Sequence, residues 1–386
     1  MSSRPPADGP PCRLGRDHSG SSRATRTHRS IGPSLYDGTS GIALFFARLY
    51  EVTKDPSAFR LSLGAIRQAL ASLDQVDVMQ RGGCFVGLAG IAYACIQVAT
   101  ILDNEYLLRE GKRVAELIEF EAGSREYDII SGRAGAVITL VNMANLLGDT
   151  EMLERAETLG KEIVNGADTV KDRSSWPSSR ATDAFSFTGF SHGASGIVYA
   201  LLRLFESTHE IEYKKYAAQG IHYEQSWFSS SEGNWADLRE VRSKRRVVPR
   251  YSTYWCHGAP GIALARMKAS SVLGEQYERE FLIALDTTAK SISASLDTAW
   301  TNCCLCHGLV GNADVLKYSC RREQRYQNIL MQFAAMAARR YKGNPSQWPC
   351  GLPEPSPGLM CGLAGIGMFF LHVNSPSLSS VLAVDL

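Results

Sequence analysis

The sequence predicts an all-α protein of about fourteen helices in seven helix-pair repeats. Two observations predict this class: a Gly-x-x-Gly motif recurs along the chain, and each copy precedes an apolar and then an amphipathic helical segment. The spacing runs from 45 residues (Gly87 to Gly132) to 65 residues (Gly193 to Gly258), which leaves room for two helices and two loops. The seven motifs begin at Gly38, Gly87, Gly132, Gly193, Gly258, Gly308 and Gly362.

The two segments of each repeat differ in hydrophobic pattern. The first is apolar on nearly all sides, as in residues 196–202, which is typical of a buried helix. The second has one apolar stripe among charged residues, as in residues 151–164. The pattern predicts an inner and an outer ring of helices, with the glycine loops crowded at one end. An open solenoid has the same periodicity, so the repeats alone leave closure undecided.

Composition places the chain among globular proteins without a strong overall charge. It has 41 basic and 39 acidic residues, a balance that does not favour nucleic acid or an anionic membrane as a partner. No apolar run reaches the roughly 18 residues of a membrane span, and the start of the chain has no signal-peptide core. We therefore expect a cytoplasmic protein, in which ten cysteines indicate metal ligands or reactive thiols rather than disulfides.

Composition also divides the chain into two parts. Residues 1–33 are rich in Ser, Pro, Gly and Arg with almost no aliphatic side chains, which predicts a disordered tail. A basic arm that contacts a partner is the alternative. Residues 34–386 are predicted to form a single domain that holds all seven repeats.

Three glycine loops carry a histidine directly before their first glycine, and in two of them a cysteine precedes that histidine. Two thiolates and one imidazole from facing loops make a tetrahedral zinc site with one open position, which is typical of a catalytic centre. A fourth protein ligand would instead make the site structural, and Cys303, Cys304 or His257 is near enough in sequence to supply it. The loop residues concerned are His192, Cys256 with His257, and Cys306 with His307.

Further motifs accompany these loops: residues 35–38 (Leu-Tyr-Asp-Gly), 188–194 (Thr-Gly-Phe-Ser-His-Gly-Ala), 233–239 (Gly-Asn-Trp-Ala-Asp-Leu-Arg), 255–261 (Trp-Cys-His-Gly-Ala-Pro-Gly), 306–308 with 311–314, 358–360 and 380–382. With them the chain resembles the lanthionine synthetase C-like cyclases over residues 34–386, and in detail the carboxy-terminal cyclase half of class II lanthipeptide synthetases. The resemblance implies a closed α/α toroid, or double barrel, with zinc held by Cys256, Cys306 and His307. It also implies that a peptide cysteine thiol adds to dehydroalanine or dehydrobutyrine in the same precursor peptide, which forms lanthionine or methyllanthionine.

The resemblance also implies roles for residues around the metal. His192 matches the active-site histidine of the family, and we expect it to carry the proton that an enolate needs, because imidazole titrates near neutrality. Asp128 matches the acidic position of the family and is expected to orient His192 or a backbone group. The alternatives are a helix-capping role for His192 and an N-cap role for Asp128. Trp255 and His257 are expected to line the substrate pocket.

Two departures from the family pattern stand out. Some members have an arginine four residues before the first zinc cysteine, where this chain has Ser252, and the nearest basic residue is Arg250. Class II synthetases also carry a large dehydratase half, which these residues do not include. A dehydrated, cysteine-containing precursor peptide and a separate dehydratase are therefore the implied partners.

Several alternatives stay open at the level of sequence. The chain is either a stand-alone cyclase or a fragment, and the roles of Cys303, Cys304 and Cys361 are unassigned. A thiol-adding enzyme that uses glutathione is a second function. A non-catalytic peptide-binding module with structural zinc is a third, in which the basic run of residues 239–250 contacts an acidic leader segment; a solvated loop is the other interpretation of that run.

Overall fold

The computed structural model describes residues 31–178, 185–241, 248–351, 355–375 and 378–385. The tail expected over residues 1–33 lies almost entirely outside these ranges, and its disorder stays a prediction. Within the described residues, no helix combines the length and apolar character that crossing a bilayer requires.

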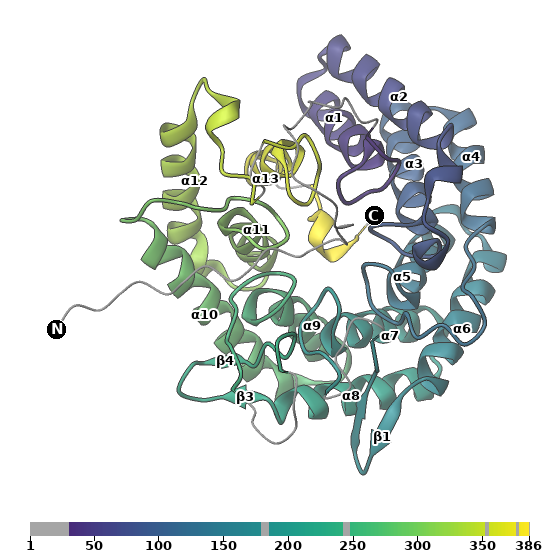
Figure 1. Cartoon of the computed structure of the whole chain (residues 1–386), viewed down its shortest axis with the longest axis vertical. Coiled ribbons are helices and arrows are strands. Elements are labelled where there is room, and N and C mark those ends of the chain that lie inside the picture. Colours follow the sequence, from purple (N-terminus) through teal and green to yellow (C-terminus); the bar gives the residue numbers. More distant parts are fainter. Residues whose placement is uncertain (1–30, 179–184, 242–247, 352–354, 376–377, 386) are drawn as a thin grey trace, which may run out of the picture.

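The described residues form thirteen α-helices, which confirms the all-α class (Figure 1). Helices that follow a glycine motif are α1 (Thr39–Thr53), α3 (Leu88–Leu102), α5 (Arg133–Leu147), α7 (Ala194–Thr208), α9 (Ala259–Val272), α11 (Leu309–Ser319) and α13 (Leu363–Asn374). Their partners are α2 (Pro56–Leu70), α4 (Glu105–Glu116), α6 (Thr150–Asn165), α8 (Ile211–Gln225), α10 (Glu278–Ser295) and α12 (Gln327–Tyr341).

The remaining elements are short. Two antiparallel strand pairs project from loops: β1 (Asp168–Val170) with β2 (Arg173–Ser175), and β3 (Phe228–Ser229) with β4 (Asn234–Trp235). The 3-10 helices are η1 (Leu73–Gln75), η2 (Val78–Gln80), η3 (Glu275–Tyr277), η4 (Gln324–Tyr326), η5 (Pro345–Gln347) and η6 (Val381–Ala383).

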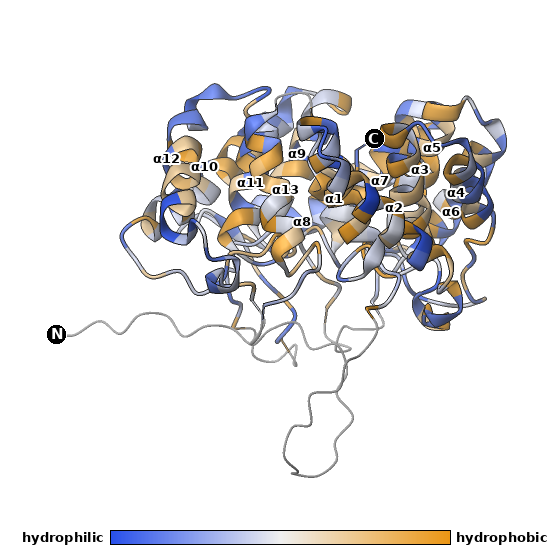
Figure 2. Cartoon of the chain, turned by 90° about the horizontal axis from the view of Figure 1, so that it is seen from above, coloured by the Kyte–Doolittle hydropathy of each residue, from blue (hydrophilic) through white to orange (hydrophobic). Residues whose placement is uncertain are grey.

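The two hydrophobic patterns sort the helices into inner and outer rings. In α3, every residue except Thr100 and Ile101 is buried, whereas α4 buries only four positions. The first three outer helices begin at side-chain caps, for example Asn104, whose Oδ1 accepts the N–H of Leu107 at 3.1 Å. Inner helices begin instead at a loop glycine without a side-chain cap, and the loops gather at one end of the ring (Figure 2).

The glycines are required mainly by close packing within each loop. A Cβ added at Gly90, the second glycine of its motif, would lie 1.6 Å from the carbonyl oxygen of Cys84 in its own loop. Gly258 is the exception among the seven first glycines, because its φ of +105° also belongs to a region that L residues rarely adopt. The motif therefore produces a compact turn at the head of each inner helix.

A circle of backbone hydrogen bonds joins the seven loops and closes the ring. In each loop the residue two before the first glycine, or in one case its neighbour Ile129, donates its N–H to the next loop at 2.7–3.2 Å. The last loop returns to the first, because Met360 donates to the carbonyl oxygen of Tyr36 at 2.7 Å. This circle excludes the open solenoid. Its members are Tyr36, Phe85, Ile130, Ser191, Cys256, Cys306 and Met360.

The last repeat departs from the expected fourteenth helix. Among the described residues no α-helix follows α13, and the segment 378–385 turns into the centre of the ring (Figure 1). Trp255 donates from Nε1 to the carbonyl oxygen of Leu382 at 3.1 Å, and Asp385 binds Arg203 together with tyrosines of three inner helices. Residues 378–385 thus bind one loop and several inner helices from inside the ring.

Candidate functional site

The repeat places chemically active side chains at equivalent points of the loops. We number loop positions back from the first glycine, so that position −2 belongs to the hydrogen-bonded circle. Cys256 and Cys306 occupy position −2 of the fifth and sixth loops. Position −1 holds His192, His257, His307 and Cys361 in the fourth to seventh loops, and position −4 holds Asp128 in the third and Cys304 in the sixth.

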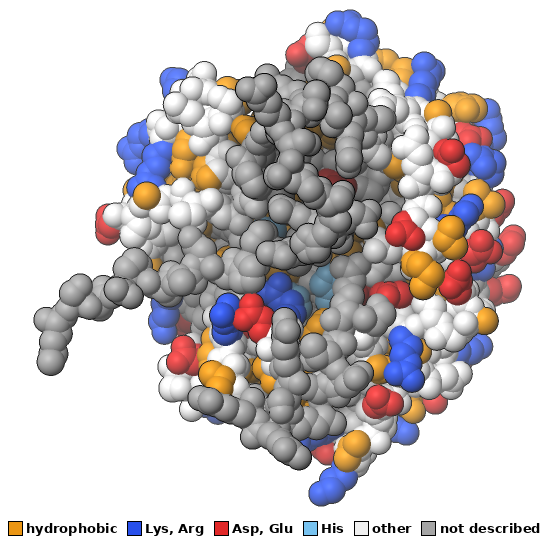
Figure 3. Space-filling model, in the orientation of Figure 1, with side chains coloured by type: hydrophobic (Ala, Val, Ile, Leu, Met, Phe, Trp, Pro, Cys, Tyr) orange, Lys and Arg blue, Asp and Glu red, His pale blue; other side chains and the backbone are white. Residues whose placement is uncertain are grey.

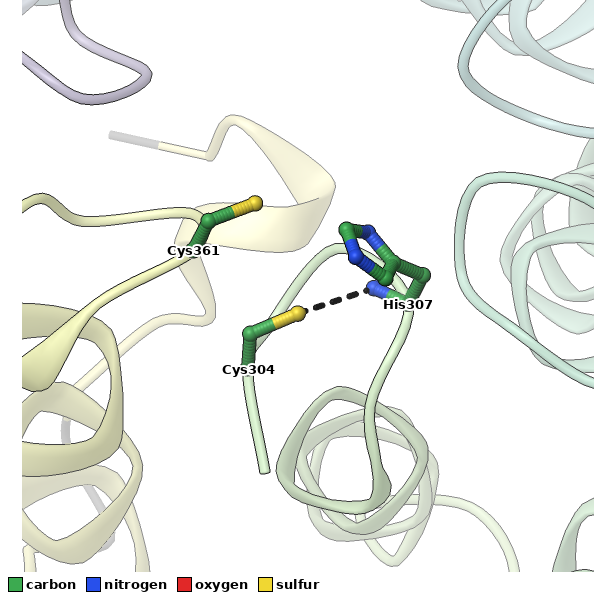
Figure 4. A group of neighbouring side chains, drawn as sticks. All are labelled: Cys304, His307 and Cys361. Carbon is green, nitrogen blue, oxygen red and sulfur yellow. Dashed lines mark hydrogen bonds between the residues drawn. The ribbon is translucent and has the colours of Figure 1, made fainter. Parts of the chain in front are cut away.

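Four sulfur atoms and one imidazole meet where the fifth, sixth and seventh loops converge. The thiol of Cys306 hydrogen-bonds with those of Cys256 and Cys361, and Cys361 also hydrogen-bonds with Cys304. The potential ligand atoms of Cys304, His307 and Cys361 all lie within 4.8 Å of one another (Figure 4). We call these five residues the thiol cluster.

The thiol cluster contains the three expected ligands but is larger than expected. Cys256 and Cys306 contact each other, while His307 groups most closely with Cys304 and Cys361. The sequence left Cys304 and Cys361 without a role. Their loop positions are the signal that was missed, because they match those of Asp128 and His192.

Hydrogen bonds inside the cluster divide the sulfurs into donors and acceptors. The hydrogen bond from Cys306 lowers the pKa of Cys256, and hydrogen bonds from Cys304 and Cys306 lower the pKa of Cys361. The pKa of Cys306 is raised by its hydrogen bonds to these acceptors, and burial raises the pKa of Cys304. Burial also lowers the pKa of His307, which favours the neutral imidazole that binds metals.

These residues fit a zinc ion. Both ring nitrogens of His307 are buried and have no hydrogen-bond partner among the described residues, an arrangement that costs free energy unless something binds there. Thiolates and neutral imidazoles are the ligands that zinc prefers.

Asp128 and His192 form a pair beside the cluster. The Nδ1 atom of His192 lies 2.5 Å from Oδ2 of Asp128, and the other carboxylate oxygen accepts the N–H groups of Ser131 at 2.8 Å and Gly132 at 3.2 Å. Asp128 was expected to orient either His192 or a backbone group, and it contacts both. A carboxylate on Nδ1 keeps the proton there and leaves Nε2 as the atom that exchanges protons.

The loop that carries His192 is held by a residue that the sequence did not single out. Glu224 of α8 is fully buried and accepts the N–H groups of Gly189 at 2.8 Å and Ser195 at 3.1 Å. Arg266 of α9 balances its charge at 3.2 Å. No sequence signal marks Glu224, because it is one of several glutamates on outer helices.

The two expected pocket residues differ in their surroundings. The Trp255 ring is fully buried between Phe85 and Phe190, so its observed contacts are those of a core residue and its contact with substrate stays a prediction. His257 stacks on His192 with ring centroids 6.1 Å apart, and its Nδ1 lies 3.1 Å from the carbonyl oxygen of Thr188. Burial, with a smaller effect of Arg239, lowers the pKa of His257 to about 3, so this imidazole is neutral.

Ser252, at the position where some members of the resembled family have an arginine, binds an aspartate that pairs with a cation from another segment. Its hydroxyl donates to Asp237 at 2.7 Å, and Asp237 pairs with Arg239 at 2.6 Å. The charge of Arg239 also lowers the pKa values of Cys256, His257 and His307. Hydrogen bonding or burial has a larger effect on each of these groups.

Arg239 is thus the cation that acts on the site, whereas Arg250, the nearest basic residue in sequence, pairs with exposed Glu240 at 3.1 Å. Figure 3 shows histidine beside basic and acidic side chains near the middle of the face of the molecule that it draws. The other basic residues of the run, Arg242, Lys244, Arg245 and Arg246, lie outside the described ranges.

Fold and site together define a class: an α/α toroid whose loop end gathers thiols and imidazoles beside an aspartate–histidine pair. The chain belongs to the lanthionine synthetase C-like protein family, whose model matches residues 29–386.

Individual relatives agree with this assignment. The chain is 29% identical over 364 residues to the lacticin 481/lactococcin biosynthesis protein LcnDR2 of Lactococcus lactis subsp. lactis, a match that covers 87% of this chain and 35% of that protein. It is 23% identical to glutathione S-transferase LANCL1 of Danio rerio, covering 89% of this chain and 82% of the relative. The structure of nisin cyclase has the same fold, with a TM-score of 0.69 at 15% identity and 92% of each chain covered.

Proposed function

We propose that the protein is a zinc-dependent lanthipeptide cyclase, which adds cysteine thiols of a precursor peptide to dehydroalanine or dehydrobutyrine. The observation that carries the proposal is the thiol cluster, with partnerless nitrogens on His307, on the same circle of loops as the Asp128–His192 pair. Cys256, Cys306 and His307 hold the metal. When bound, zinc supplies the Lewis acidity that keeps a cysteine thiol deprotonated near neutral pH.

The residues of the chain account for the movement of electrons and protons. The substrate sulfur forms a bond to the β-carbon of the dehydro residue, and the electron pair of the alkene moves to the amide carbonyl as an enolate. His192 delivers a proton from Nε2 to the α-carbon, and Asp128 stabilises the imidazolium form. The thiol proton is thereby replaced by one on carbon, and the peptide neither gains nor loses atoms. The charge of Arg239 acts on Cys256 and His257, and we propose that it also stabilises the developing enolate.

Counting thiols tests the cyclase. The purified protein is incubated with zinc and a dehydrated precursor peptide, and free thiols are then alkylated and counted by mass spectrometry. Ring closure leaves the mass of the peptide unchanged before alkylation but removes thiols. A peptide that remains fully alkylatable, under conditions in which the protein retains zinc, contradicts cyclase activity.

A second candidate has support from the Danio rerio relative, which is named as a glutathione S-transferase and matches this chain over most of both lengths. In that case the thiol comes from glutathione, and the dehydrated peptide gains the mass of glutathione without losing its own thiols. A zinc-loaded protein that binds the precursor peptide and does neither reaction would support the third function, a peptide-binding module with structural zinc.

The proposed partners follow from the reaction. The chain spans about a third (35%) of the length of its lactococcal relative. The dehydro residues must come from a dehydratase, and we propose a separate one, acting on the precursor peptide before cyclisation. The nine described cysteines are all free thiols, which suits the reducing cytoplasm that the sequence predicted.

A further inference from the structure

At several points of the ring, the side chain at position −4 of one loop lies close to the side chain at position −1 of the next loop. Asp128 of the third loop meets His192 of the fourth in this way, and Cys304 of the sixth meets Cys361 of the seventh. The ring of Tyr254, at position −4 of the fifth loop, lies 6.4 Å from that of His307. The repeat itself therefore brings Cys361 to Cys304, just as it brings His192 to Asp128.

Cys361 contacts several members of the thiol cluster. Its thiol hydrogen-bonds with Cys304 and Cys306, lies 3.4 Å from the hydroxyl of Tyr36, and is within 4.8 Å of a ring nitrogen of His307. The residue is 6% exposed. Cys306 contacts Cys361 as it contacts Cys256, so both sulfurs flank the same expected ligand.

Cys361 lies within reach of an ion bound to His307. With Zn–S bonds of about 2.3 Å and Zn–N bonds of about 2.1 Å, a thiolate and an imidazole nitrogen on one tetrahedral zinc are about 3.6 Å apart, and those of Cys361 and His307 lie within 4.8 Å of each other. Cys304 has a different position, since its sulfur accepts the backbone N–H of His307 at 3.3 Å. Cys304 is thus placed to fix the loop and to hydrogen-bond to Cys361.

We propose that Cys361 is a fourth protein ligand of the zinc ion, which closes the centre formed by Cys256, Cys306 and His307, with Cys304 as its hydrogen-bond donor. This inference rests on the proposed function, because it requires zinc. A substrate thiol then enters by exchange with Cys361: the entering thiol gives up its proton, the Cys361 sulfur takes one up, and the charge of the centre is unchanged.

Cobalt substitution tests the ligand. The intensity of the thiolate-to-cobalt charge-transfer band reports how many thiolates are bound. At equal cobalt loading, Cys361→Ala should reduce this band by about one third, as three thiolates become two. Cys320→Ala removes a half-buried thiol outside the cluster and should leave the band unchanged. Zinc X-ray absorption on the unmodified protein should show three sulfur neighbours and one nitrogen.

A cysteine-containing peptide tests the exchange. In the unmodified protein the peptide thiol replaces Cys361 and the band keeps its intensity, whereas in Cys361→Ala the band rises by about one half. An unchanged band in Cys361→Ala, or two sulfur neighbours in the unmodified protein, overturns the inference and leaves the three-ligand zinc centre intact. A weaker charge-transfer band in Cys304→Ala but not in Cys361→Ala makes Cys304 the ligand and also overturns the inference. Failure to bind either metal removes the proposed zinc function as well.

Discussion

At the scale of residues, the pair formed by Asp128 and His192 separates proton transfer from metal binding. His192→Asn should lower the rate of thioether formation by about 10²–10⁴-fold, because the proton donor is lost, while zinc content stays the same. Thiol alkylation measures the rate, and metal analysis measures the zinc. His209→Asn, at an exposed helix end, is the control. Loss of zinc from the His192 variant would make that residue a ligand.

Arg239 should set the pH range in which the centre holds its metal. Zinc binding requires deprotonated ligands, and removing this cation raises the pKa values of the proposed ligands Cys256 and His307. In Arg239→Gln, the pH at which half the zinc is lost to a chelator should therefore move upward. Arg250→Gln, which removes an exposed charge paired with Glu240, should not move it. An equal shift in both variants would point to net charge rather than to the position of Arg239.

At the scale of elements, the glycine loops depend on close packing, and at Gly258 they depend on the positive φ as well. A Cβ at Gly258 would lie 1.7 Å from the carbonyl oxygen of Ser252, at a positive φ. Gly258→Ala should reduce the free energy of unfolding by about 2–4 kcal/mol. Gly64→Ala, on the exposed face of α2 with no atom within 4 Å, should raise it by about 0.5–1 kcal/mol. Urea denaturation distinguishes the two, and similar effects at both sites would contradict the packing argument.

The outer helix α8 also supports a loop of the site. Glu224 of α8 binds the backbone of the loop that carries His192, and Arg266 of α9 neutralises its buried charge. An outer helix thus holds the loop that carries His192, and an inner helix supplies the charge that balances the holding residue.

At the scale of the whole molecule, the closed circle of loops and the segment in its centre make one cooperative unit. Asp385 binds Arg203 and Tyr199 of inner helix α7 and Tyr318 of inner helix α11. Asp385→Asn should lower the free energy of unfolding by about 1.5–3 kcal/mol, because charged hydrogen bonds are lost and Arg203 keeps its charge. Asp297→Asn, on the surface, should change it by less than about 0.5 kcal/mol. Non-coincident circular dichroism and tryptophan fluorescence transitions would show that the ring does not unfold as a unit.

Most of the architecture was predictable from periodicity. The glycine motif marks the head of every inner helix, and the apolar and amphipathic patterns assign the inner and outer rings, because burial constrains every residue of a helix face. The family followed from loop motifs such as residues 255–261 and 306–308. These features are local, so a reading along the chain is enough to recognise them.

Contacts between distant residues were not predictable in the same way. The hydrogen bond from Met360 to Tyr36 that closes the circle, the meeting of Cys304 with Cys361, and the support of Arg239 by Ser252 join residues far apart in sequence or on different loops. The expected fourteenth helix is replaced, in the described residues, by a segment that enters the ring. Such contacts depend on how the repeats are rotated about a common axis. Helical periodicity carries no information about that rotation, which follows from the packing of each inner helix on the next.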